Sequence, residues 1–92
     1  MLKLYKVAKS EWGIYLLASI DNDDKVRNVR VVLHEDYTVD RIDVYYHSNR
    51  SNSYSGNLSG HRMPYKYRTY ILEAKKQFKQ YIENGGEILC IE

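Results

Sequence analysis

The side chains best suited to chemistry in this sequence are histidines, arginines and tyrosines that gather between residues 46 and 68. A histidine with a pKa near neutral can take the 2′-hydroxyl proton of RNA while cations hold the phosphate, so His47 or His61 would be the base of a metal-free endoribonuclease. The same residue types bind RNA or single-stranded DNA without cleavage, through charge and stacking. They are also common at protein contacts. The candidate partner-binding residues are Tyr46, His47, Arg50, Tyr54, His61, Arg62, Tyr65, Lys66 and Arg68.

The distribution of charge also points to this segment. The net charge of the chain is +2, which is too small to indicate nucleic-acid binding by itself. Seven acidic and four basic residues lie from Asp21 to Asp43, whereas no acidic residue lies between Asp43 and Glu73. We therefore expect a positive surface over residues 47–70, and nucleic acid is one partner that such a surface would attract.

No motif for a metal, a cofactor or a covalent catalyst accompanies these residues. The run 21–25 resembles the start of a calcium loop, but Lys25 takes a ligand position and Val26 replaces the required glycine. A turn is the favoured interpretation. The run 34–36 places His, Glu and Asp side by side, and neighbours on a strand point to opposite faces and cannot converge on one ion. We expect no metal, no cofactor and no catalytic residue.

Length and composition predict a single domain over residues 1–92. A chain of 92 residues with 43% hydrophobic and 28% charged residues is typical of one small globular domain. The single cysteine, Cys90, lies in the apolar run 88–91, which predicts a buried free thiol in a reducing compartment. No window approaches the roughly 20 apolar residues that cross a membrane. We therefore expect a cytoplasmic protein without membrane contact.

The first half of the sequence predicts four strands. The second of these segments is apolar on both sides, with Trp12 on one apolar face, which is typical of a central strand. The third and fourth alternate between apolar and polar residues, which predicts one solvent face each. The expected strands cover residues 2–8, 12–20, 28–34 and 41–46, with a polar turn at 21–24.

The second half predicts a long loop, one helix and a last strand. Residues 48–62 are rich in Ser, Asn and Gly, which is typical of a mobile loop. Pro64 suits the first position of a helix, and Gly85 suits its end. A last strand should run from Glu87 to Ile91. The apolar side of the helix is expected to hold Tyr67, Ile71, Ala74, Phe78, Tyr81 and Ile82, opposite a lysine-rich side.

These elements predict an α+β domain of two layers. An antiparallel-rich sheet of about five strands, in the order β-β-β-β-α-β, should carry one amphipathic helix packed on one face. An exposed edge strand of such a sheet could also pair two copies of the chain into a homodimer.

We expect a small non-enzymatic binding or inhibitor protein that occupies a site on a larger protein or nucleoprotein complex. In size and style, though through no residue motif, the chain is comparable to inhibitors encoded by phages and mobile elements, such as anti-CRISPR proteins. The alternatives are an RNA- or single-stranded-DNA-binding domain and a metal-free endoribonuclease toxin.

Overall fold

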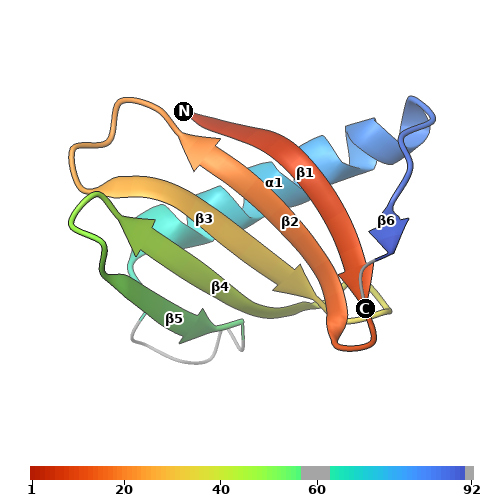
Figure 1. Ribbon diagram of the computed structural model, residues 1–92, viewed down its shortest axis with the longest axis horizontal. Helices are drawn as coiled ribbons and strands as arrows, with labels where there is room; N and C mark the ends of the chain where they lie inside the picture. Colours follow the sequence, from red (N-terminus) through yellow and green to blue (C-terminus); the bar gives the residue numbers. More distant parts are fainter. Residues whose placement is uncertain (57–62, 91–92) are drawn as a thin grey trace.

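The computed structural model describes residues 1–56 and 63–90, and it consists of a six-stranded sheet with one helix packed on one face (Figure 1). The elements are β1 (Leu2–Ser10), β2 (Gly13–Ile20), β3 (Val26–Leu33), β4 (Val39–Tyr46), β5 (Ser51–Ser55), α1 (Tyr65–Glu83) and β6 (Leu89–Cys90). The strand order is β5-β4-β3-β2-β1-β6, and only the β1–β6 pair is parallel. This confirms the α+β architecture, with one strand more than the five expected.

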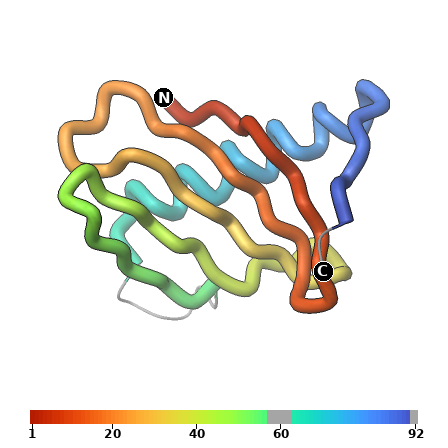
Figure 2. Tube along the Cα trace, viewed as in Figure 1, coloured from red at the N-terminus to blue at the C-terminus, as the bar shows by residue number. Residues whose placement is uncertain are grey.

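The helix crosses one face of the sheet diagonally. It begins near β4 and β5 and ends beside β1 and β6, as the trace in Figure 2 shows. Tyr67, Ile71, Ala74 and Phe78 are buried against the sheet, as their spacing predicted. The side-chain amide of Gln77 donates to the carbonyl of Leu2 and accepts from the backbone N–H of Leu4, both at 2.8 Å, and so ties the helix to β1.

The core lies between the helix and the central strands. Most inward side chains of β2, β3 and β4 are buried, because their alternation places every second residue under the helix. The two-sided apolar character of β2 correctly predicted a central strand. The fully buried inward side chains include Leu16, Val29, Val31, Ile42 and Val44. Within the described residues, no helix is long and apolar enough to cross a membrane.

The segment 48–62, predicted to be a loop, contains strand β5. Ser51–Ser55 pairs antiparallel with β4, so that Ser53 lies opposite Asp43 and Tyr54 opposite Ile42. A serine-rich strand gives no alternating apolar pattern, and the prediction of a loop was therefore wrong for these residues. Pairing of backbone groups with β4 forms the strand without that pattern.

The position predicted for Trp12 was also wrong. Ser10 pairs with Gly13, so Trp12 lies in the turn between β1 and β2 instead of on the apolar face of a strand. Gly13 explains where β2 begins: its φ is +143°, and a Cβ there would lie 2.5 Å from the carbonyl oxygen of Leu33. Only glycine tolerates that approach, and the inward alternation starts one residue later, at Ile14.

The C-terminal end of the described chain is more exposed than the sequence predicted. Of the strand predicted over 87–91, Leu89–Cys90 forms β6 at the edge of the sheet, Ile91 lies outside the described residues, and Cys90 is exposed instead of buried. Tyr81 and Ile82, placed on the apolar side of the helix by their spacing, are also exposed. In Figure 1 the C-terminal end of α1 lies beyond β1, beside the chain that leads to β6, and the Tyr81 hydroxyl donates there to the carbonyl of Glu87.

Candidate functional site

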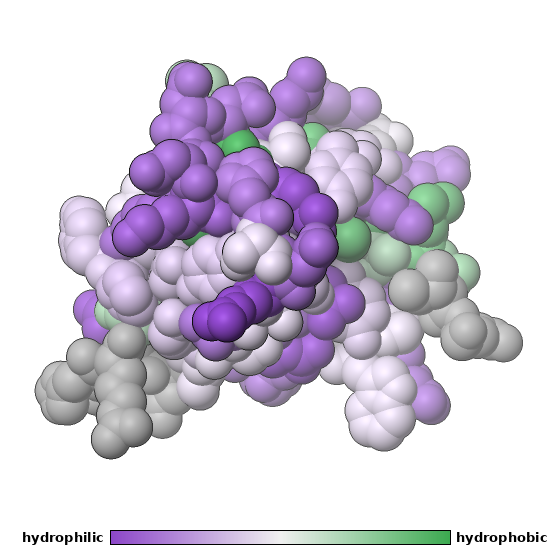
Figure 3. All heavy atoms as spheres, turned by 60° about the vertical axis from the view of Figure 1, so that its left-hand side comes forward, coloured by the Kyte–Doolittle hydropathy of each residue, from purple (hydrophilic) through white to green (hydrophobic). Residues whose placement is uncertain are grey.

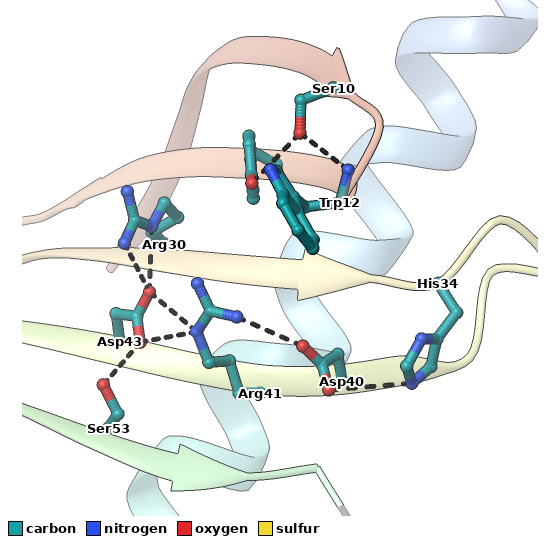
Figure 4. A network of polar contacts seen from close by, with 9 residues as sticks. Ser10, Trp12, Arg30, His34, Asp40, Arg41, Asp43 and Ser53 are labelled. Atoms are coloured by element: carbon teal, nitrogen blue, oxygen red, sulfur yellow. Dashed lines mark hydrogen bonds and ion pairs between the residues drawn. The ribbon is translucent and has the colours of Figure 1, made fainter.

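No element within residues 1–56 and 63–90 covers the face of the sheet opposite the helix (Figure 1), and this face carries a row of polar and aromatic side chains. We call this surface the open face. Its central side chains come from four neighbouring strands, because every second residue of each points away from the helix. They are Tyr15 of β2, Arg30 of β3, Arg41, Asp43 and Tyr45 of β4, and Ser53 of β5. Figure 4 shows Arg30, Arg41, Asp43 and Ser53 together in front of the sheet, with the helix behind.

Asp43 is the centre of this row. Asp43 is only 3% exposed, although no described element covers this face of the sheet. Arg30 donates from Nε to one carboxylate oxygen at 2.8 Å, and a terminal guanidinium nitrogen forms an ion pair with the same oxygen at 2.8 Å. Arg41 donates from Nε at 3.1 Å, and the Ser53 hydroxyl donates at 2.6 Å. One carboxylate thus links β3, β4 and β5.

The electrostatics of Asp43 follow from these contacts. Burial alone would raise the pKa of the Asp43 carboxyl, but the hydrogen bonds from Ser53 and Arg30 and the charge of Arg41 lower it below its ordinary value. The Arg41 guanidinium also pairs with Asp40 at 3.2 Å. The positive charges of the two arginines are therefore neutralised by two carboxylates, and these ion pairs restrain the side chains.

Aromatic rings lie beside Arg30. The guanidinium carbon lies 5.5 Å from the ring centroid of Tyr15 and 5.9 Å from that of Tyr45, within the range of cation–π contacts. The Ser10 hydroxyl donates to the Tyr15 hydroxyl at 3.1 Å. The two rings thus flank the Arg30 guanidinium on the open face.

Trp12 lies at the end of this row, in the turn between β1 and β2, and it is 76% exposed. The backbone N–H of Trp12 donates to the Ser10 hydroxyl at 3.1 Å, and Figure 4 shows the indole on the same side of the sheet as Arg30 and Asp43. The sequence predicted a solvent face for β3 and β4 but did not identify their side chains there as a candidate site. The available signal was that Arg41, Asp43 and Tyr45 occupy alternate positions of one predicted strand and therefore share one of its faces.

Two of the predicted site residues, Tyr46 and Tyr54, belong to a cluster on the helix side of the sheet. The hydroxyls of Tyr46 and Tyr67 lie 3.2 Å apart, and the ring centroids of Tyr54 and Tyr67 lie 5.2 Å apart. Burial and the hydrogen bond with Tyr46 raise the pKa of Tyr67 above its ordinary value. Tyr46 and Tyr54 are half-buried packing residues and present little free surface.

A third predicted residue, Lys66, lies beside Asp23. Its ammonium nitrogen is 2.7 Å from an Asp23 carboxylate oxygen, which also accepts from the Tyr70 hydroxyl at 2.8 Å. The other oxygen accepts from the backbone N–H groups of Lys25 and Val26. Burial would raise the pKa of Asp23, but these hydrogen bonds, that from Lys66 foremost, lower it well below its ordinary value.

The remaining predicted residues do not form one site in the described structure. His47 and Arg50 are exposed in the turn between β4 and β5, and Tyr65 is 82% exposed at the start of α1. The His47 ring nitrogen lies 3.2 Å from the carbonyl oxygen of Asp23. Arg68 is on the first turn of the helix, whereas His61 and Arg62 lie outside the described residues.

The side of the molecule that carries these turns and the helix start is hydrophilic. Figure 3 brings it forward, and hydrophobic atoms appear there only in small, separate areas. Among the described residues, no group of three or more His, Cys, Asp and Glu side chains could hold a metal ion. The open face thus carries the hydrogen-bonded row around Asp43, with the exposed Trp12 at its end. No protein family, no curated protein and no solved structure matches this chain.

Proposed function

We propose that this chain is a non-enzymatic binding domain that occupies a site on a larger protein, as an inhibitor or an accessory subunit. The contact surface would be the open face together with Trp12. The observation that carries the proposal is the 76% exposed indole of Trp12 beside a fixed row of tyrosine and arginine side chains. Trp, Tyr and Arg are the residue types that most often dominate protein interfaces.

The order of this surface supports the same function. Arg30 and Arg41 already have fixed partners in Asp43, so little side-chain freedom would be lost when a partner binds. Tyrosine and tryptophan add contact area at low entropic cost, because each has only two side-chain torsions. A preorganised surface of this kind suits recognition of another folded protein.

The charge of the open face favours protein over nucleic acid. A surface that binds phosphates needs cations that are free to replace counterions. Here the guanidinium of Arg30 is paired with Asp43, and that of Arg41 with Asp43 and Asp40. Protein binding is therefore the favoured function, and the experiment must distinguish it from binding to RNA or single-stranded DNA.

The experiment compares two exposed aromatic residues on different sides of the molecule. The tagged full-length chain, Trp12→Ala and Tyr65→Ala are used to capture partners from lysate, with and without nuclease. A nuclease-resistant protein that is lost with Trp12→Ala and kept with Tyr65→Ala supports the proposal. The matched control Tyr65 is itself one of the residues that the sequence predicted.

Three results would contradict the proposal. A partner lost only with Tyr65→Ala would move the site to the helix start. Recovery of nucleic acid alone would favour a nucleic-acid-binding domain. Cleavage of RNA by the purified chain without added metal, abolished by His47→Ala or His61→Ala, would make it an endoribonuclease.

A further inference from the structure

A groove on the helix side of the molecule lies between α1 and the turn that joins β3 to β4. Its volume is about 570 Å³. Leu33 at the end of β3 and Phe78 of the helix are buried at its floor. The apolar walls are Tyr37 of the turn and Leu72 and Ile82 of the helix. The groove is thus apolar, and it lies on the opposite side of the sheet from the open face.

The walls of the groove are exposed to solvent. Leu72 is 69% exposed and Tyr37 is 54% exposed, and both are large apolar side chains. Leu72 and Ile82 lie ten positions apart on α1, about 15 Å or nearly three turns, and Lys75 and Lys79 lie between them on the same side of the helix. A surface with this shape does not enclose a small apolar ligand, but it matches the length of a short helix laid alongside α1.

Tyr37 is held over the groove by an unfavourable backbone conformation. Its φ is +71°, a value that bulky side chains rarely adopt. Its ring packs edge-on against Phe78, with 5.7 Å between the ring centroids. Glycine or asparagine would fit the same turn with less strain. Tyr37 therefore adds apolar surface to the groove, while its backbone conformation destabilises the turn.

Lysines lie among the apolar side chains of the helix side of the groove. Lys75, Lys76 and Lys79 line it, and among the described residues that line it Glu83 alone is acidic. The groove is therefore positive, and a partner with acidic residues beside its apolar side chains would be complementary in charge. A second copy of this chain would bring lysines against lysines if the two helices met along this groove, so self-association is disfavoured.

We propose that this groove docks an acidic amphipathic helix of about three turns, supplied by another protein. Apolar side chains of that helix would lie on Leu72, Tyr37 and Phe78. Its acidic side chains would face the three lysines. This mode, in which an apolar helix face lies in a groove, is one of the recurring ways in which proteins recognise peptides. The proposal is independent of the open face, because it uses the other layer of the molecule.

The test uses a synthetic peptide of about 18 residues with leucines at helical spacing and glutamates on both flanks. It is titrated into the isotope-labelled full chain, and amide shifts are followed by NMR. We expect the shifts to map to the groove and the affinity to fall with salt. Leu72→Ala should weaken binding by about fivefold or more, and Lys76→Glu by about threefold to tenfold. Both side chains are exposed, so neither change should unfold the domain.

Two controls make the result specific. Lys25→Glu makes the same change of charge at the opposite end of β3, and should leave the affinity unchanged. A peptide with lysines in place of the glutamates should bind at least about tenfold more weakly. Equal binding of that peptide, or amide shifts on the open face instead of the groove, would overturn the proposal. Binding to vesicles of anionic lipid but not to the acidic peptide would overturn it as well.

Discussion

Asp43 and Asp23 are two poorly accessible carboxylates that organise different parts of the molecule. Asp43 is held by side chains of its own and adjacent strands, namely Arg30, Arg41 and Ser53. Asp23 lies in the turn before β3 and is held by side chains of the helix and by its own turn. The first network is local to the sheet, and the second joins the two layers. Their loss should therefore have different structural consequences, which can be measured separately.

The largest effect should come from Asp43→Ala. This change leaves two arginines on the open face without their shared carboxylate, and we expect the free energy of unfolding to fall by about 3 kcal/mol. Urea unfolding followed by far-UV circular dichroism measures it, because the exposed Trp12 is a poor fluorescence reporter of unfolding. The control is Asp40→Ala, which removes a more exposed partner of Arg41 and should cost about 0.5 kcal/mol. Equal losses would mean that the central carboxylate has no special role.

Asp23→Ala should lower the free energy of unfolding by less than Asp43→Ala, but it should also change the helix, which lies far from Asp23 in the sequence. It removes acceptors of two backbone N–H groups and a charged partner of Lys66, so we expect a loss of about 2 kcal/mol. Amide hydrogen exchange should also speed up in the first turns of α1, because those turns lose a link to the sheet. The neighbouring exposed Asp24→Ala is the matched control. Unchanged exchange at the helix start would contradict the proposed link between the layers.

The two networks also differ in how far the sequence could predict them. Once β3 and β4 are assigned, their alternation places Arg41 and Asp43 on the same face of the sheet. The sequence does not give the register between the strands, which places Arg30 opposite Asp43. That register depends on the length and bulges of the strands, which alternation does not determine. The contact of Asp23 with Lys66 joins residues far apart in the chain, and no local pattern indicates it.

The same reasoning separates the correct and incorrect predictions of the fold. The helix was predicted well because its buried residues repeat at helical spacing over many turns. Strand β5 was not predicted, because its sequence has no apolar alternation. Contacts of Ser53 with β4 and of Tyr54 with α1 position these residues. Tyr46 and Tyr54 were predicted as partner-binding residues, and their packing against Tyr67 of the helix start had no signal in the sequence.

Acid should reduce the difference between the wild-type chain and its carboxylate variants. The pKa of both aspartates is lower in the folded chain than the ordinary value of about 3.9. The stability they supply is therefore complete above about pH 4 and is lost as the pH falls through the folded pKa. The gap between the wild type and Asp43→Asn should be constant from pH 7 to pH 5 and shrink below pH 4. A gap that does not change with pH would mean that charge contributes little to this network.

Among the changes in the Asp23 network, the smaller effect is that of Tyr70→Phe, which removes only the hydroxyl that donates to Asp23. Burial, and then this hydrogen bond, raise the pKa of Tyr70 to about 12, which agrees with a hydroxyl that keeps its proton. The change should cost about 1 kcal/mol, whereas Tyr65→Phe on the exposed side of the helix should cost nothing measurable.

A double-mutant cycle then tests whether Tyr70 acts through the carboxylate. If it does, Tyr70→Phe should lose most of its effect when Asp23 is already alanine, with a coupling of about 1 kcal/mol. Additive losses would mean that the Tyr70 ring contributes only by packing against Tyr67, whose ring centroid lies 6.1 Å away. In that case the link between the helix and the turn would depend on Lys66 alone, and salt should weaken it more than it weakens the network around Asp43.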